Sequence, residues 1–201
     1  MKTAVCLALT IILINCVNNQ LTSSHISTLR SREYLQHNIY RSKHQSTSNI
    51  TNDTKLETDA QAYADYLIDQ PTVGVLNYSH AAWSGINGEN IYWQKYTMSF
   101  NPYSSVFYNG YEASNSWYNG IFNYNFTTGA NINTPGADTG LFTAMVWTTV
   151  NKVGCGYACR EENYTRTGGI EMMWSVECYA VCKYLPTPNL GSKTAHVKPL
   201  I

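Results

Sequence analysis

The chain has 201 residues, with 13 basic and 13 acidic side chains, so its formal net charge at pH 7 is zero. This balance, without a basic run or an acidic tail, gives no reason to expect a nucleic-acid partner or an electrostatic membrane patch. A chain of this length can form one domain with a sizeable core.

Residues 1–19 have the pattern of a secretory signal peptide. Lys2 supplies a short positive start, and residues 3–17 are mostly apolar and carry no charge. This run is shorter than the ~20 residues that span a bilayer, and polar residues follow it. We therefore predict a secreted, extracellular protein without integral membrane insertion, cleaved between Cys16 and Leu21. An uncleaved membrane anchor is the less favoured alternative.

Two helices are predicted in the first third of the chain. The first spans about residues 28–45, with Ser31 as a candidate cap and an apolar stripe made of Leu29, Tyr34, Leu35, Ile39 and Tyr40. The second spans about 56–69 and ends before Pro71, which cannot continue a helix. Its apolar residues follow helical spacing: Leu56, Ala60, Tyr63, Ala64 and Leu67.

The remaining elements point to an α+β fold. Residues 74–104 predict short strands and loops, and residues 105–122 predict a helix. A Gly- and Asn-rich loop over 122–138 follows, and residues 141–147 fit a short helix or a buried strand equally well. Residues 152–159 and 171–184 predict strands, and residues 191–201 a flexible tail.

Four cysteines remain after the signal peptide is removed, and their spacing favours one pairing. Cys155 with Cys182 and Cys159 with Cys178 have the same residue-number sum, so both pairs fit one antiparallel register. A separation of four residues also places both pairs on one face of the strands. We predict these two disulfides; a zinc site is the weaker alternative, because export is oxidising and no Cys-x-x-Cys spacing occurs.

The chain also carries five glycosylation sequons with the Asn-x-Ser/Thr pattern. Such sequons in an exported eukaryotic chain are candidate glycan sites on exposed loops, although the abundance of Asn and Thr also allows chance matches. The acceptor residues are Asn49, Asn52, Asn77, Asn125 and Asn163.

Several blocks in chain order resemble the CAP superfamily, which includes cysteine-rich secretory, antigen 5 and pathogenesis-related 1 proteins, and in particular its venom allergen-like members from parasitic worms. The blocks are His37-Asn38-x-x-Arg41, Ala60–Ala64, Gly88–Tyr92, Gly140–Trp147 and Cys182–Asn189. The resemblance covers about residues 28–190, taken as one CAP domain. It implies an α-β-α sandwich with helices on both sides of a small, mostly antiparallel sheet.

The same resemblance implies a cleft that is only half complete. The family builds it from two His and two Glu; His80 and Glu89 match, whereas Gly120 replaces a Glu and Leu141 replaces a His. Because zinc needs three or four good ligands, we expect no metal, no cofactor and no catalytic residues. The alternative interpretation of His80 is a hydrogen-bonded structural histidine. The alternative interpretation of the His37 block is an exposed polar helix face.

Aromatic residues around the 122–138 loop point to an apolar ligand. The resemblance implies a sterol-binding loop here and, in some relatives, a fatty-acid channel between two helices, here about 31–45 and 105–122. The candidate lipid-binding residues are Trp117, Tyr118, Phe122, Tyr124, Phe126 and Phe142. Core packing is the alternative, favoured for Trp117 and Phe142, whereas Tyr124 and Phe126 are expected to be exposed.

The sequence therefore predicts a secreted, non-enzymatic protein that binds sterol, fatty acid or both at a host–parasite interface. A protein-binding immunomodulatory module with host proteins as partners is the alternative. A metal-dependent protease is less favoured, because His80 and Glu89 would have to suffice alone.

Overall fold

A computed structural model describes residues 21–70, 88–98, 110–132, 139–165 and 172–201. Its centre is a four-stranded sheet in the order β1-β3-β4-β2, in which β1 runs parallel to β3 and the other pairs are antiparallel. The strands are β1 (Thr51–Asn52), β2 (Gly88–Met98), β3 (Lys152–Thr165) and β4 (Met172–Leu185).

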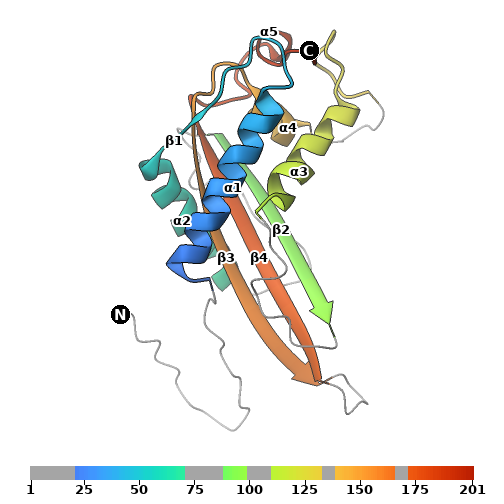
Figure 1. The fold of residues 1–201 in the computed structure, drawn as a ribbon. Coiled ribbons are helices and arrows are strands. Elements are labelled where there is room, and N and C mark those ends of the chain that lie inside the picture. The colour runs from blue at the N-terminus through green and yellow to red at the C-terminus, as the bar shows by residue number, and fades with distance from the viewer. Residues whose placement is uncertain (1–20, 71–87, 99–109, 133–138, 166–171) are drawn as a thin grey trace.

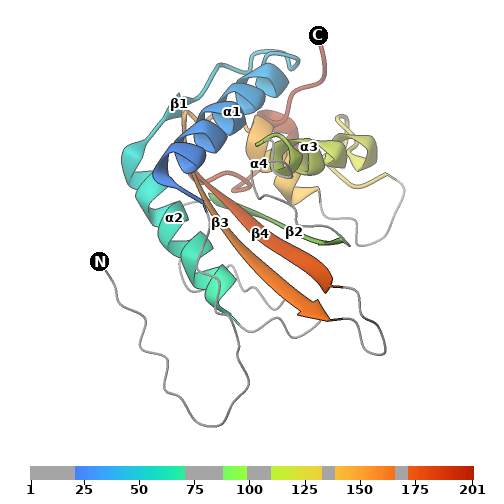
Figure 2. The same cartoon turned by 60° about the horizontal axis from the view of Figure 1, so that its bottom comes forward.

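Helices cover both faces of this sheet, which confirms the expected α-β-α sandwich (Figures 1 and 2). One face carries α2 (Thr54–Asp69). The other carries α1 (Ser23–Arg41), α3 (Glu112–Tyr118) with the 3-10 helix η3 (Asn119–Asn123), and α4 (Gly140–Val146). None of the helices in these ranges is both long enough and apolar enough to cross a bilayer.

Two glycines of β3 allow α2 to lie directly on the sheet. A Cβ atom at Gly154 would lie 2.2 Å from the backbone nitrogen of Glu57, and one at Gly156 would lie 2.3 Å from that of Gln61. Both distances are too short for any side chain, so the helix backbone occupies this space. On the next residues of the strand, Cys155 and Tyr157 point to the opposite face and join the core beneath α1.

The buried face of α1 is mostly polar, and the predicted apolar stripe is confirmed only in part: Leu29 is buried, and Tyr34 and Tyr40 are partly buried against the core. The helix begins at Ser23, where the Thr22 side chain accepts a hydrogen bond from the His25 backbone, and not near Ser31. Its buried residues are Leu29, Glu33, His37 and Arg41. Leu35 and Ile39 from the predicted stripe are 53% and 42% exposed. Hydrophobic periodicity failed here because His37 and Arg41 are buried with hydrogen-bond partners.

The second helix, by contrast, is confirmed together with its apolar stripe. Its five predicted stripe residues are all buried against the sheet. Asp53 caps its start by accepting from the backbone of Lys55 and Leu56. Of the two structures left open for residues 141–147, the helix is the one that forms.

Both predicted disulfides are present. In the β3–β4 register Cys155 lies opposite Cys182 and Cys159 opposite Cys178, each pair with its Cα atoms 4.1 Å apart. The first of these strands extends further than expected, to Thr165, whereas the second, Met172–Leu185, lies within one residue of its predicted bounds.

The C-terminal residues pack on the domain, which corrects the expectation of a flexible tail over 191–201. They include the short helix α5 (Lys193–His196), and the Val197 side chain is buried in the core. His44 forms a bridge with Leu200, and the Gln45 amide donates to the Pro199 carbonyl at 3.0 Å. These contacts join the end of the chain to the end of α1.

Candidate functional site

Glu89 is one of the two cleft residues that match the family pattern, and its carboxylate forms an ion pair with a lysine. Its Oε2 lies 2.8 Å from Nζ of Lys183 on the neighbouring strand, and both side chains are 1% exposed. The Lys183 ammonium also lies 5.6 Å from the centre of the Tyr63 ring on α2. The positive charge of Lys183 therefore offsets the negative charge of the buried Glu89 carboxylate. His80 lies outside the described residues.

The two lost cleft positions both lie at α4: Leu141 is part of this helix, and Gly120 packs against it. A Cβ atom at Gly120 would lie 2.8 Å from Cβ of Phe142, so Phe142 occupies the space into which a longer side chain would extend. Leu141 is partly buried against the core, and its carbonyl accepts from Asn90 Nδ2 at 2.9 Å. These positions therefore supply packing and backbone contacts, and neither Gly nor Leu offers a metal ligand.

Strand alternation separates Glu89 from its neighbour Asn90. Glu89 points toward α2, whereas Asn90 points to the opposite face, where its Nδ2 donates to the Tyr184 hydroxyl at 3.2 Å. The same hydroxyl lies 2.9 Å from Nε2 of His37. His37 is thus a buried, hydrogen-bonded residue, and the expectation of an exposed polar face for its motif is wrong.

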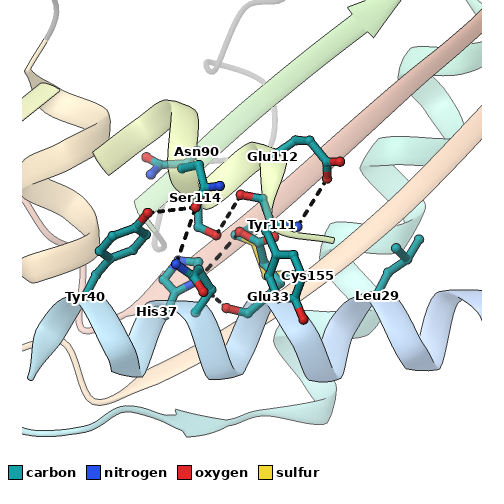
Figure 3. Close-up of polar contacts among 12 residues, drawn as sticks. Leu29, Glu33, His37, Tyr40, Asn90, Tyr111, Glu112, Ser114 and Cys155 are labelled. Atoms are coloured by element: carbon teal, nitrogen blue, oxygen red, sulfur yellow. Dashed lines mark hydrogen bonds and ion pairs between the residues drawn. A yellow bond between two sulfur atoms is a disulfide. The ribbon is translucent and has the colours of Figure 1, made fainter. Parts of the chain in front are cut away.

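Sequence reasoning missed Glu33, a fully buried carboxyl one turn before His37. Figure 3 shows Glu33 and His37 rising from α1 toward Ser114 of α3 and Asn90 of β2. Burial raises the pKa of Glu33 to about 8; Ser114 opposes this rise, although neither Glu33 oxygen completes a hydrogen bond among the described residues. Burial lowers the pKa of His37 to about 4. Both groups are therefore uncharged at pH 7.

This cluster does not fit a metal ion. Ligand atoms of Glu33, His37 and Cys182 lie within 4.8 Å of one another. However, the Cys182 sulfur is bonded to Cys155 and is not a thiolate, which leaves one carboxyl group and one imidazole, fewer than the three or four ligands that zinc needs. The only signal in the sequence was the four-residue spacing of Glu33 and His37 on one helix face.

Glu33 should make the protein less stable as the pH rises through neutrality. Folded Glu33 keeps its proton up to about pH 8, whereas the unfolded chain loses it near 4.5, so the free energy of unfolding falls between these values. His37 acts in the opposite direction between pH 4 and 6.5. The two slopes cancel where they overlap, and a net loss of about 2 kcal/mol remains between pH 6.5 and 8.

Urea unfolding at these two pH values checks this prediction. Glu33→Gln should remove the fall, because an amide cannot ionise, while the exposed control Glu162→Gln should retain it. An identical fall in the Glu33→Gln variant would show that another group is responsible.

The rest of the first-helix motif also has a structural role. Asn38 accepts from the Ile50 backbone amide at 2.9 Å and donates to the Ile50 carbonyl. Arg41 donates to the carbonyls of Met145 and Trp147 at the end of α4. The motif therefore joins α1 to the segment around Ile50 and to the end of α4.

The six candidate lipid-binding residues divide into a core and an exposed edge. Ring contacts join Tyr118, Tyr124, Phe126 and Phe142, with His44 beside them. Trp117 and Phe142 are buried, as the core alternative expected. Tyr124 is 2% exposed, so its expected exposure is wrong, and Phe126 is half-buried. Phe122 is 75% exposed and forms the outer edge.

Comparison with known proteins assigns the chain to a family. The profile of the "Cysteine-rich secretory protein family" (CAP) matches residues 34–184. The human Golgi-associated plant pathogenesis-related protein 1 is 30% identical over 156 residues, which cover 77% of this chain and 80% of that protein.

Solved structures agree with this assignment at the level of the fold. The structure of NaASP2 with Zn²⁺ has a TM-score of 0.53 at 18% identity and covers 92% of each chain. Na-ASP-1 has a TM-score of 0.54 at 19% identity over 92% of this chain, which spans 44% of Na-ASP-1. Together with the profile match, these likenesses show that the chain belongs to the CAP family of cysteine-rich secretory proteins.

Proposed function

We propose that this protein is a secreted, non-enzymatic CAP protein that binds a sterol at the edge of the loop after α3. The observation that carries the proposal is the exposure of two large apolar side chains on this edge. Phe122 is 75% and Ile132 is 54% exposed. The Ile132 amide donates to the Asn123 carbonyl at 2.8 Å, which holds the two residues on neighbouring segments.

The residues beneath this edge suit a flat apolar ligand with one polar group. Tyr124, Phe126 and Phe142 lie edge-to-face below it and form an aromatic floor. The buried Tyr124 hydroxyl has no hydrogen bond within the described ranges. Because this atom is also closed to solvent, a ligand hydroxyl reaches it only when the aromatic floor opens; a sterol combines such a hydroxyl with an extended apolar body.

The structure gives less support to a fatty acid between α1 and α3. The Tyr40 and Tyr118 rings stack with their centres 3.8 Å apart, and the Tyr40 hydroxyl donates to Asn115 at 2.7 Å. An acyl chain between these helices would have to separate the stack.

The cleft residues support the absence of enzymatic activity. Glu89 is paired with Lys183, and Gly120 and Leu141 carry no group that acts as a base or nucleophile.

A cholesterol-binding titration with matched variants tests the proposal. Phe122→Ser/Ile132→Ser should weaken binding by about tenfold or more, because each apolar side chain contributes roughly 1.5–3 kcal/mol on burial. The control Leu35→Ser/Ile39→Ser removes two exposed apolar side chains from α1 and should leave binding unchanged. A parent chain without saturable cholesterol uptake would contradict the proposal.

The second candidate is a protein-binding module, and the exposed face of α1 favours it. Leu35 and Ile39 lie one turn apart on the same face of the helix, and both are exposed. If the Leu35→Ser/Ile39→Ser chain loses a host-protein partner while the parent chain binds no lipid, this candidate replaces the first.

A further inference from the structure

A polar pocket lies between α1 and the start of α2, away from the aromatic loop. Its volume is about 320 Å³, near the lower limit for small-ligand sites. Residues of α1, β1 and α2 line it: Ser27, Arg30, Ser31, Tyr34, Asn52 and Glu57.

The charges in this pocket are already matched. A guanidinium nitrogen of Arg30 lies 3.6 Å from Oε2 of Glu57, and its Nε donates to the Cys155 carbonyl at 2.8 Å. Because the cation and the anion face each other, neither favours an ion as the occupant. The hydroxyls of Ser27 and Ser31 and the ring of Tyr34 complete the lining, and this combination suits a neutral ligand with many hydroxyls.

One wall of the pocket is itself a sugar-acceptor residue. Asn52 begins the sequon Asn52-Asp53-Thr54 and is exposed. Its Nδ2 donates one hydrogen to Oε1 of Glu57 at 2.7 Å. An amide nitrogen carries two hydrogens, so the second position stays available for a bond to a sugar while Glu57 fixes the side chain.

We propose that the first sugars of an N-linked glycan on Asn52 occupy this pocket and join α1 to α2. The attachment point, the neutral polar lining and the aromatic ring all point to this occupant. The inference rests on export, which is part of the proposed function, and is independent of sterol binding. A glycan in this position would add a second connection between two helices from opposite faces of the sheet, which Arg30 of α1 and Glu57 of α2 already join.

The chain offers an internal control three residues away. Asn49 lies on the same connection, is exposed and is not part of the pocket lining. In full-length protein from a eukaryotic secretory host, glycopeptide mapping should find Asn52 occupied. A peptide N-glycosidase acting on the folded protein should release the Asn52 glycan about tenfold more slowly than the Asn49 glycan. After denaturation, the two rates should be equal.

Two substitutions in the lining sharpen the test. Tyr34→Ala removes the ring, and Ser31→Phe fills the pocket from an exposed position that folding tolerates. Both should raise release at Asn52 to the Asn49 rate and leave Asn49 unchanged. An unoccupied Asn52, or equal release in the folded parent chain, would overturn this inference alone. A chain without glycans at any sequon would overturn it together with export.

Discussion

Arg41→Met should reduce the free energy of unfolding by at least about 4 kcal/mol, or prevent folding. The guanidinium is buried and donates to the carbonyls of Ser48, Met145, Trp147 and Val150 at 2.8–3.1 Å. Burial lowers the pKa of Arg41 to about 10, so the group remains charged at neutral pH. Methionine fills a similar volume but removes the guanidinium donor from all four carbonyls, of which that of Trp147 still accepts from the Val150 amide.

Urea unfolding followed by circular dichroism measures this effect. Lys55→Met is the matched control, because it also removes a cation and its side chain is 82% exposed beside Asp59. Such a surface pair contributes at most about 1 kcal/mol. If the two variants lost similar stability, the carbonyl contacts of Arg41 would not be what holds α1 to the end of α4.

Lys183→Met should have the second largest effect, a loss of about 3–5 kcal/mol. It leaves the Glu89 carboxylate buried without the ammonium that lies 2.8 Å away. Removing both charges in Glu89→Met/Lys183→Met should recover most of this loss, because a buried ion pair and an apolar pair of similar volume are often close in stability.

A double-mutant cycle from thermal or urea unfolding gives the coupling between the two residues. Additive losses in the double variant would mean that Glu89 and Lys183 act independently. The pairing would then not explain why the cleft carboxylate is unavailable.

Hydrophobic periodicity predicted the buried face of α2 but not that of α1, and the reason is physical. Periodicity found α2 because its buried face is apolar, and it failed on α1 because Glu33, His37 and Arg41 occupy the buried positions. A pattern of apolar residues cannot detect burial that depends on partners far away in the chain, such as Tyr184 and Val150.

The candidate site could be predicted only in part for a similar reason. Family motifs located Glu89, Gly120 and Leu141, but the partner of Glu89 depends on the register between β2 and β4. Lys183 lies in the block Cys182–Asn189, but the block alone does not reveal which side chain it faces. Likewise, Tyr124 sits next to polar residues in the sequence, yet the turn after η3 directs it into the core.

The two disulfides have a consequence for how the protein survives digestion. Both join β3 to β4, and the chain segment that Cys155–Cys182 closes contains the one that Cys159–Cys178 closes. A single cut between Cys159 and Cys178 would therefore release no peptide, because the two halves remain covalently joined through sulfur. A protease could nick this hairpin and leave both strands in the sheet, with α1 and α2 still covering its two faces.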